Sequence, residues 1–182
     1  MSRYFAFLRA INVGGHTVQM KQLQRLFESL GFANVETFLA SGNVIFETSL
    51  KDAKALAGKI EKKLAEALGY EVATFIRTEA ELAEIAKHQP FPKAEFESAA
   101  AFNIAFLAEA LDDGSRRKLM ALRTDIDSFH IRGREVYWLC RRKQSESTFS
   151  NAVLEKTTGK RSTLRGANTV VKLAARYPPS ES

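Results

Sequence analysis

The chain of 182 residues contains one cysteine, Cys140, and only three histidines, His16, His88 and His130. A single cysteine excludes an internal disulfide, and the apolar sequence around Cys140 indicates a small core residue. No histidine has a partner at the spacing of metal ligands, so the sequence predicts no metal site and no cofactor. This cysteine usage is typical of a reducing compartment, and we expect the protein in the cytoplasm.

Long apolar runs and catalytic motifs are also absent. No segment approaches the roughly 20 apolar residues that a membrane-spanning helix needs. The start of the chain, Met1-Ser2-Arg3-Tyr4-Phe5, lacks the pattern of a signal peptide. We therefore expect no membrane partner. The sequence has no Walker phosphate loop and no nucleophile elbow, and we recognise no catalytic constellation in it.

The composition is that of a globular protein with an uneven charge. Hydrophobic residues make up 45% of the chain and charged residues 26%, which is enough apolar material for a core. Residues 1–130 carry 16 lysines and arginines against 17 aspartates and glutamates, whereas residues 131–176 carry 11 against 3. The resulting net charge of +8 in residues 131–176 favours an anionic partner, and a solvated basic surface is the alternative.

The first half of the chain is predicted to form the order β-α-β-β-α-β. Apolar residues at helical spacing predict one helix that ends at Gly31 and a second, capped near Ser49 and Asp52, that ends at Gly69. Strands are predicted at residues 4–11, 35–39, 44–46 and 72–76. This order predicts an α+β domain of ferredoxin-like type, a four-stranded antiparallel sheet with two helices on one face.

The second half shows a less regular pattern and no close sequence repeat of the first. Strands are predicted at residues 102–107, 128–131 and 135–140, and helices at residues 79–88, 115–123, 149–156 and 167–176. We interpret this as a second, degenerate ferredoxin-like unit with an extra C-terminal helix. The predicted boundaries are a domain at 1–88, a linker at 89–99, a second unit at 100–177 and a tail at 178–182. We expect the second half to cover the open face of the first sheet, because the first strand is apolar on both sides.

Two loops have the chemistry of an anion site. In a ferredoxin-like fold the Gly14-Gly15 loop, the Ser41-Gly42-Asn43 turn and the turn at Gly69 gather at one end of the sheet. The amides of Gly14 and Gly15 could cradle a phosphate there, and a plain turn is the alternative. Residues 160–165 are predicted to lie between two helices, with Asn168 at the start of the last one. That segment fits either a phosphate or carboxylate site or an ordinary capped interhelical loop.

Several stretches closely resemble a bacterial family known as domain of unknown function 1697 (DUF1697). The N-terminal resemblance lies in Phe7-Leu8-Arg9-Ala10-Ile11-Asn12-Val13-Gly14-Gly15, Met20, Leu23 and residues 37–46. The C-terminal resemblance lies in Phe149-Ser150-Asn151, Leu154-Glu155-Lys156, Thr163-Leu164-Arg165 and Asn168-Thr169-Val170. Gly166-Ala167 departs from the Asn-Trp-like pair that the family has at this point. The resemblance implies two ferredoxin-like units in one chain and no established activity.

The function predicted from these features is the binding of an anionic partner, either a nucleic acid or a phosphorylated small molecule. An enzyme that acts on a small anionic substrate and a protein-interaction module are the alternatives, and the oligomeric state stays open. We predict that residues from both halves share one cleft, because clefts between domains are common ligand sites. The candidate ligand-binding residues are Arg9, Asn12, Gly14, Gly15, Ser41, Asn43, Lys156, Thr163, Arg165 and Asn168.

Overall fold

The computed structural model describes residues 1–9, 17–39 and 42–180. The chain divides into two compact units. Unit 1 consists of Met1–Ile85 together with Leu173–Ser182, and unit 2 consists of Ala86–Lys172. We describe each unit by itself.

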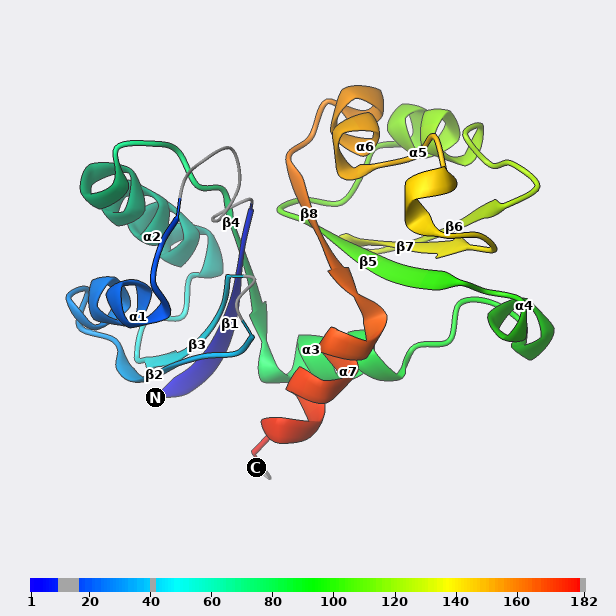
Figure 1. The fold of residues 1–182 in the computed structure, drawn as a ribbon. Helices are drawn as coiled ribbons and strands as arrows, with labels where there is room; N and C mark the ends of the chain where they lie inside the picture. The colour runs from blue at the N-terminus through cyan, green and yellow to red at the C-terminus, as the bar shows by residue number, and fades with distance from the viewer. Residues whose placement is uncertain (10–16, 40–41, 181–182) are drawn as a thin grey trace. The chain divides into compact units, whose positions relative to one another are not determined.

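Unit 1 is the predicted ferredoxin-like fold. Its elements are β1 (Ser2–Leu8), α1 (Met20–Glu28), β2 (Ala33–Thr37), β3 (Asn43–Thr48), α2 (Ala53–Leu68) and β4 (Thr74–Thr78). The four strands form an antiparallel sheet in the order β2-β3-β1-β4, with α1 and α2 on one face of it (Figure 1).

The core of unit 1 follows from the apolar spacing in its sequence. The strand residues Tyr4, Ala6 and Leu8 alternate along β1, and they pack with the buried stripes of α1 and α2. The side chain of Asp52 caps α2 by accepting from the amides of Lys54 and Ala55. The helix ends at Gly69, whose φ of +81° is the left-handed conformation that glycine adopts most easily.

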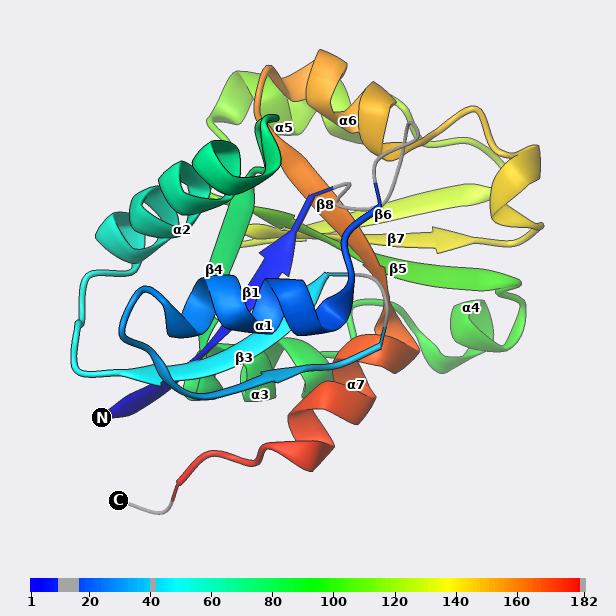
Figure 2. The same ribbon diagram turned by 60° about the vertical axis from the view of Figure 1, so that its left-hand side comes forward.

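Unit 2 repeats the same topology. Its elements are α4 (Lys93–Glu97), β5 (Ala101–Leu107), α5 (Asp113–Met120), β6 (Asp127–Arg132), β7 (Glu135–Cys140), the 3-10 turn Gln144–Glu146, α6 (Asn151–Thr158) and β8 (Ser162–Gly166). The sheet order β6-β7-β5-β8 matches that of unit 1. Helices α5 and α6 lie beside each other on one face of this sheet (Figure 2).

The structure corrects the prediction for residues 160–165. This segment is not an interhelical loop, because Ser162–Gly166 is strand β8 and pairs antiparallel with β5. Unit 2 is therefore a complete β-α-β-β-α-β unit and not a degenerate one. A short helix, α4, also lies within the segment predicted as a linker.

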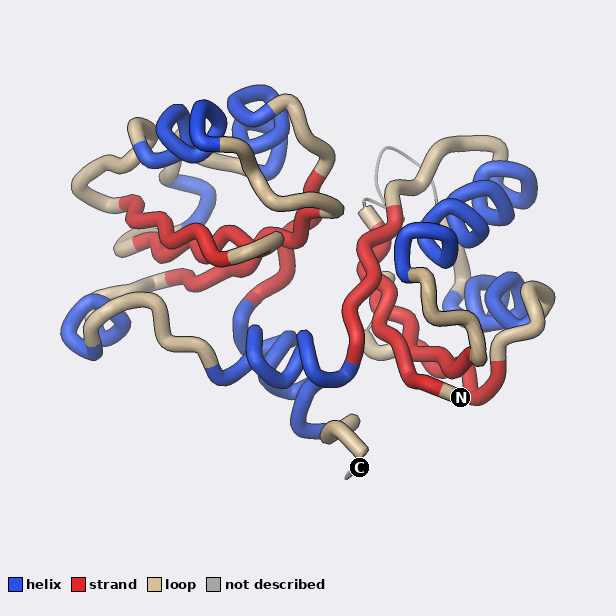
Figure 3. Tube along the Cα trace, turned by 180° about the vertical axis from the view of Figure 1, so that it is seen from behind, coloured by secondary structure: helices blue, strands red, loops and turns tan. Residues whose placement is uncertain are grey.

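Strand register shows which positions of the two units are equivalent. Phe5 of β1 pairs with Arg77 of β4, and Ile104 of β5 pairs with Arg165 of β8. Arg77 and Arg165 therefore occupy the same place in their sheets, and both are buried. In each unit a glutamate of the second helix also accepts from the first amide of the last strand: Glu61 from Thr74 and Glu155 from Ser162, each at 3.0 Å. Figure 3 shows the two sheets, each with its pair of helices.

Each unit is followed by a helix that ends in the other unit. Helix α3 (Glu79–Lys87) follows β4, and α7 (Ala167–Arg176) follows β8. The division into units falls inside both helices, so Leu173 and the residues after it belong to unit 1. Tyr177 lies edge-on to Phe5, which points away from α1 and α2, with ring centroids 6.0 Å apart. Tyr177 thus covers part of this face of the sheet of unit 1, and the covering of the face by the second half stays a prediction.

Candidate functional site

The structure describes only part of the predicted gathering of loops at one end of unit 1. The amide of Leu8 donates to the carbonyl of Gly42 at 2.9 Å, and the amide of Arg9 donates to the carbonyl of Ala73 at 2.9 Å. The end of β1 therefore lies beside the turn before β3 and beside the segment before β4. The candidates Asn12, Gly14, Gly15 and Ser41 lie outside the described residues.

Asn43 has a structural role at this end of the sheet. Its side chain is only 1% exposed, and its Nδ2 donates to the carbonyl of Phe38 at 2.8 Å. The amide of Phe38 in turn donates to the carbonyl of Asn43 at 3.0 Å. The side-chain amide therefore closes the β2–β3 turn from inside.

The C-terminal candidates fall into a buried pair and an exposed pair. Thr163 and Arg165 are buried in β8, where Nη1 of Arg165 donates to Oγ1 of Thr163 at 2.9 Å and to the carbonyl of Leu164 at 2.8 Å. Burial lowers the pKa of the Arg165 guanidinium to about 10. Lys156 on α6 and Asn168 on α7 are exposed.

The placement of Arg165 in a strand determines what its replacement would cost in stability. A loop arginine would be exposed and replaceable at little cost in stability, but Arg165 is 8% exposed and sits in a strand. Replacing it removes buried packing of the aliphatic stem as well as two hydrogen bonds. The shared cleft of Arg9 and Arg165 combines residues of both units and stays a prediction.

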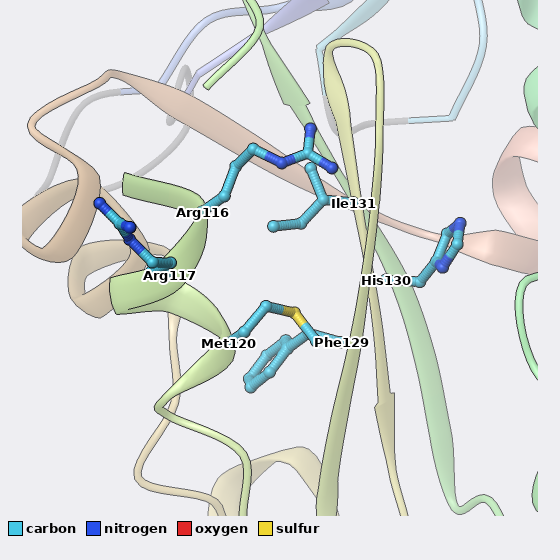
Figure 4. Close-up of a pocket in the computed structure, with 6 residues that line it drawn as sticks. All are labelled: Arg116, Arg117, Met120, Phe129, His130 and Ile131. Carbon is cyan, nitrogen blue, oxygen red and sulfur yellow. The ribbon is translucent and has the colours of Figure 1, made fainter. Parts of the chain in front are cut away.

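A pocket that the sequence did not reveal lies within unit 2, between α5 and β6. Its volume is about 350 Å³, and it is lined by Arg116, Arg117, Met120, Phe129, His130 and Ile131. The alternation of β6 places Phe129 and Ile131 on the helix side of the sheet, where both join the core of unit 2. In Figure 4, Arg116 extends from α5 toward Ile131, Met120 faces Phe129, and the side chain of Arg117 points away from them.

His130 is also among the lining residues of the pocket. Its ring points away from Phe129 and Ile131 (Figure 4). It lies instead beside His88, with ring centroids 5.2 Å apart, and near Tyr137 and Phe91. Burial lowers the pKa of His130, and the positive charges of Arg132 and Arg116 lower it further.

The electrostatic surroundings of the pocket are positive. Arg116 and Arg117 are exposed, and the structure gives their side chains no hydrogen bond or ion pair to any described residue. Unit 2 contains 16 lysines and arginines against 10 aspartates and glutamates, whereas unit 1 contains 11 of each. The net charge of +6 therefore lies entirely in unit 2. An uncompensated arginine above an apolar floor is suited to hold an anion.

Sequence reasoning identified the elements of this pocket but not the pocket itself. The run Arg116-Arg117-Lys118 on a predicted helix and the alternation of Phe129 and Ile131 were the available signals.

Among the described residues, no group of three or more histidines, cysteines, aspartates and glutamates could hold a metal ion. In the same part of the chain, no helix combines the length and apolarity needed to cross a bilayer.

Comparisons with known proteins support the fold and leave the activity open. The chain is similar to the solved structure of conserved bacterial protein SP0830 from Streptococcus pneumoniae. The two share 23% sequence identity with a TM-score of 0.78, over 98% of this chain and 99% of that one. No curated protein matches the sequence. Residues 1–137 match the family described as protein of unknown function (DUF1697), and the chain belongs to that family.

Proposed function

We propose that the protein binds a phosphorylated small molecule and that the α5–β6 pocket of unit 2 is the binding site. The observation that carries this proposal is Arg116, an exposed arginine with no described partner, above an apolar floor in the unit that holds all the net charge. The pocket volume of about 350 Å³ is within the range of small-molecule sites. The single cysteine supports a cytoplasmic setting for this function.

The chemistry of the pocket favours an anion over a cation or a neutral polar ligand. A guanidinium presents several N–H donors in a planar fork that matches phosphate oxygens. The six lining residues include no carboxylate that would compete for that fork. Burial is the main cause of the lowered pKa of His130, and the charges of Arg132 and Arg116 add to it; a bound phosphate would offset that second contribution.

A titration of inorganic phosphate and pyrophosphate, followed by calorimetry, tests the proposal. Binding is expected to the wild type and to be at least about tenfold weaker in Arg116→Gln, because a charged hydrogen bond is lost. Lys118→Gln, on the same helix but outside the pocket, and Arg25→Gln, on α1 of unit 1, remove one charge each without touching the site. Equal loss in all three variants would point to a diffuse charge effect and reject the pocket as the site.

A nucleic acid is the second candidate partner. Exposed cations are spread over several elements of unit 2, among them Arg132, Arg142, Lys156 and Arg161. Such a distribution suits contacts to a phosphate backbone without base readout. Binding of a mixed oligonucleotide that falls steeply with salt, and is insensitive to Arg116→Gln, would favour this candidate over the small molecule.

A further inference from the structure

The floor of the α5–β6 pocket is apolar apart from the two arginines. Met120 and Ile131 are half-buried and offer the apolar surface that a ligand would meet, whereas Phe129 is only 4% exposed and contributes mainly an edge. The ring of His130, the one other polar side chain of the lining, lies on the opposite face of the strand (Figure 4). Beyond the arginine head groups, the lining side chains therefore offer no hydrogen-bond donor or acceptor to a ligand.

The size of the pocket limits what can accompany the phosphate. About 350 Å³ is near the lower end of the range for small-molecule sites, which fits one ring system and its charged group. A flat ring suits this floor in particular, because a thioether such as Met120 and an aromatic edge such as Phe129 both make favourable contacts with aromatic systems. The guanidinium of Arg116 can also stack on such a ring.

We infer that the ligand is a phosphate monoester with a flat, weakly polar ring, of the size class of a nucleoside monophosphate. Arg116 contacts the phosphate, and the ring lies against Met120, Phe129 and Ile131. Because the floor has no donor or acceptor that could read ring substituents, the site selects for the charge and for the area of the ring and discriminates weakly between bases. This inference rests on the proposed function and specifies its ligand class.

A ligand series on the full chain tests the ring separately from the phosphate. The probes are inorganic phosphate, phenyl phosphate, adenosine monophosphate, cytidine monophosphate and uncharged adenosine. We expect phenyl phosphate to bind about tenfold tighter than inorganic phosphate, because a ring buries apolar area. The two mononucleotides should lie within about tenfold of each other, and adenosine should not bind measurably. The imidazole signals of His130, followed by NMR, should titrate at a higher pH when phenyl phosphate is bound.

Two variants test where the ring and the phosphate of the ligand bind in the pocket. Met120→Ala should weaken phenyl phosphate and leave inorganic phosphate unchanged, whereas Arg116→Gln should weaken both, and circular dichroism checks that each variant is folded. If phenyl phosphate binds no tighter than inorganic phosphate, or if Met120→Ala changes neither, the ring inference is wrong while the proposed function stands. If none of the phosphates binds, the proposed function itself is wrong. Strong preference for one base would also overturn the inference, because this floor cannot supply it.

Discussion

The two units have the same fold but place opposite chemistry at one equivalent position. Glu36 on β2 pairs with Ile45, and His130 on β6 pairs with Tyr137 at the same point of the sheet. In unit 1 the carboxylate of Glu36 accepts a hydrogen bond from Tyr177, the residue after α7. In unit 2 the ring of His130 contacts His88, the residue after α3. The edge strand of each unit thus meets the end of a helix that began in the other unit.

The comparison shows which features the fold requires and which it does not. Both units keep the glutamate at the last strand, the left-handed glycine after the second helix and the buried arginine. They differ in net charge, and the cations around the α5–β6 pocket belong to unit 2 alone. Because unit 1 forms the same sheet without this excess of charge, the basic surface of unit 2 is not a requirement of the fold. This is the main reason to treat it as a functional surface.

The largest expected effect concerns a buried carboxylate of unit 2. Trp138 occupies the place that Phe46 has in unit 1, and its Nε1 donates to Asp127 Oδ1 at 2.9 Å. Asp127 also accepts from Ser147 and Thr124. We expect Asp127→Ala to reduce the free energy of unfolding by about 3–5 kcal/mol, because three donors lose a buried carboxylate. Denaturation followed by the fluorescence of Trp138 measures it.

A control and a rescue accompany this prediction. Asp125→Ala, at an exposed position two residues away, should change stability by within about 0.5 kcal/mol. Trp138→Phe in the Asp127→Ala background should recover part of the loss, because it removes the indole donor and restores the residue type of unit 1. A loss no larger for Asp127→Ala than for Asp125→Ala would show that this network does not support unit 2.

The next effect is specific to unit 1. Tyr177→Ala removes the edge contact with Phe5, the hydrogen bond to Glu36 and the position of the ring under the guanidinium of Arg3. We expect a loss of about 2 kcal/mol, and of about 1 kcal/mol or less for Tyr177→Phe, which keeps the ring. Hydrogen exchange should show faster exchange in β1 and β2 than in β5 and β6. Equal acceleration in both sheets would contradict a local role for Tyr177.

A third test examines whether replacing equivalent residues of the two units reduces the free energy of unfolding by the same amount. Glu61→Ala and Glu155→Ala each leave the first amide of the last strand without its carboxylate acceptor. Each should reduce the free energy of unfolding by about 1–2 kcal/mol. The corresponding glutamine variants retain an acceptor oxygen and should cost less. Chemical denaturation of all four variants measures this, and a large difference between the two alanine variants would break the equivalence of the units.

The smallest expected effect is a dependence of stability on pH that originates in unit 2. The pKa of His130 is lowered in the folded protein, so between that pKa and the unfolded value of about 6.5 the unfolded chain binds more protons. The contribution of His130 is therefore fully present above about pH 6.5 and is lost as the pH falls toward the folded pKa. His130→Phe should flatten this part of the curve of unfolding free energy against pH. An unchanged slope would exclude His130 as its source.

The sequence predicted most elements because their apolar residues recur at regular spacing, but β8 lacks that signal. Ser162, Thr163 and Arg165 are all buried, yet they are polar, so no alternation of apolar and polar residues marks the strand. Hydrogen bonds compensate for their burial: Ser162 exchanges two with Asn151 of α6, and Arg165 donates to Thr163 and Leu164 of its own strand. Helix α4 was missed because it has five residues and follows the prolines that mark a linker.

The candidate site was less predictable than the fold. Asn43 was singled out for its polar side chain in a turn, but a polar side chain in a turn often satisfies its own backbone, as it does here. The pocket of unit 2 depends on Arg116 and Ile131, which come together because α5 packs against β6. That packing is a tertiary arrangement, and the local pattern of either segment does not contain it.

Helices α3 and α7 each begin in one unit and end in the other, and this affects the order in which the two units are completed during synthesis. During synthesis the sheet of unit 1 is made before unit 2, but Leu173 and Tyr177, which also belong to unit 1, are made after it. Unit 2 needs nothing beyond Lys172, so its residues are all available before those of unit 1. The unit that is begun first is therefore finished second, and a chain that stops at Lys172 contains every residue of unit 2 but only part of unit 1.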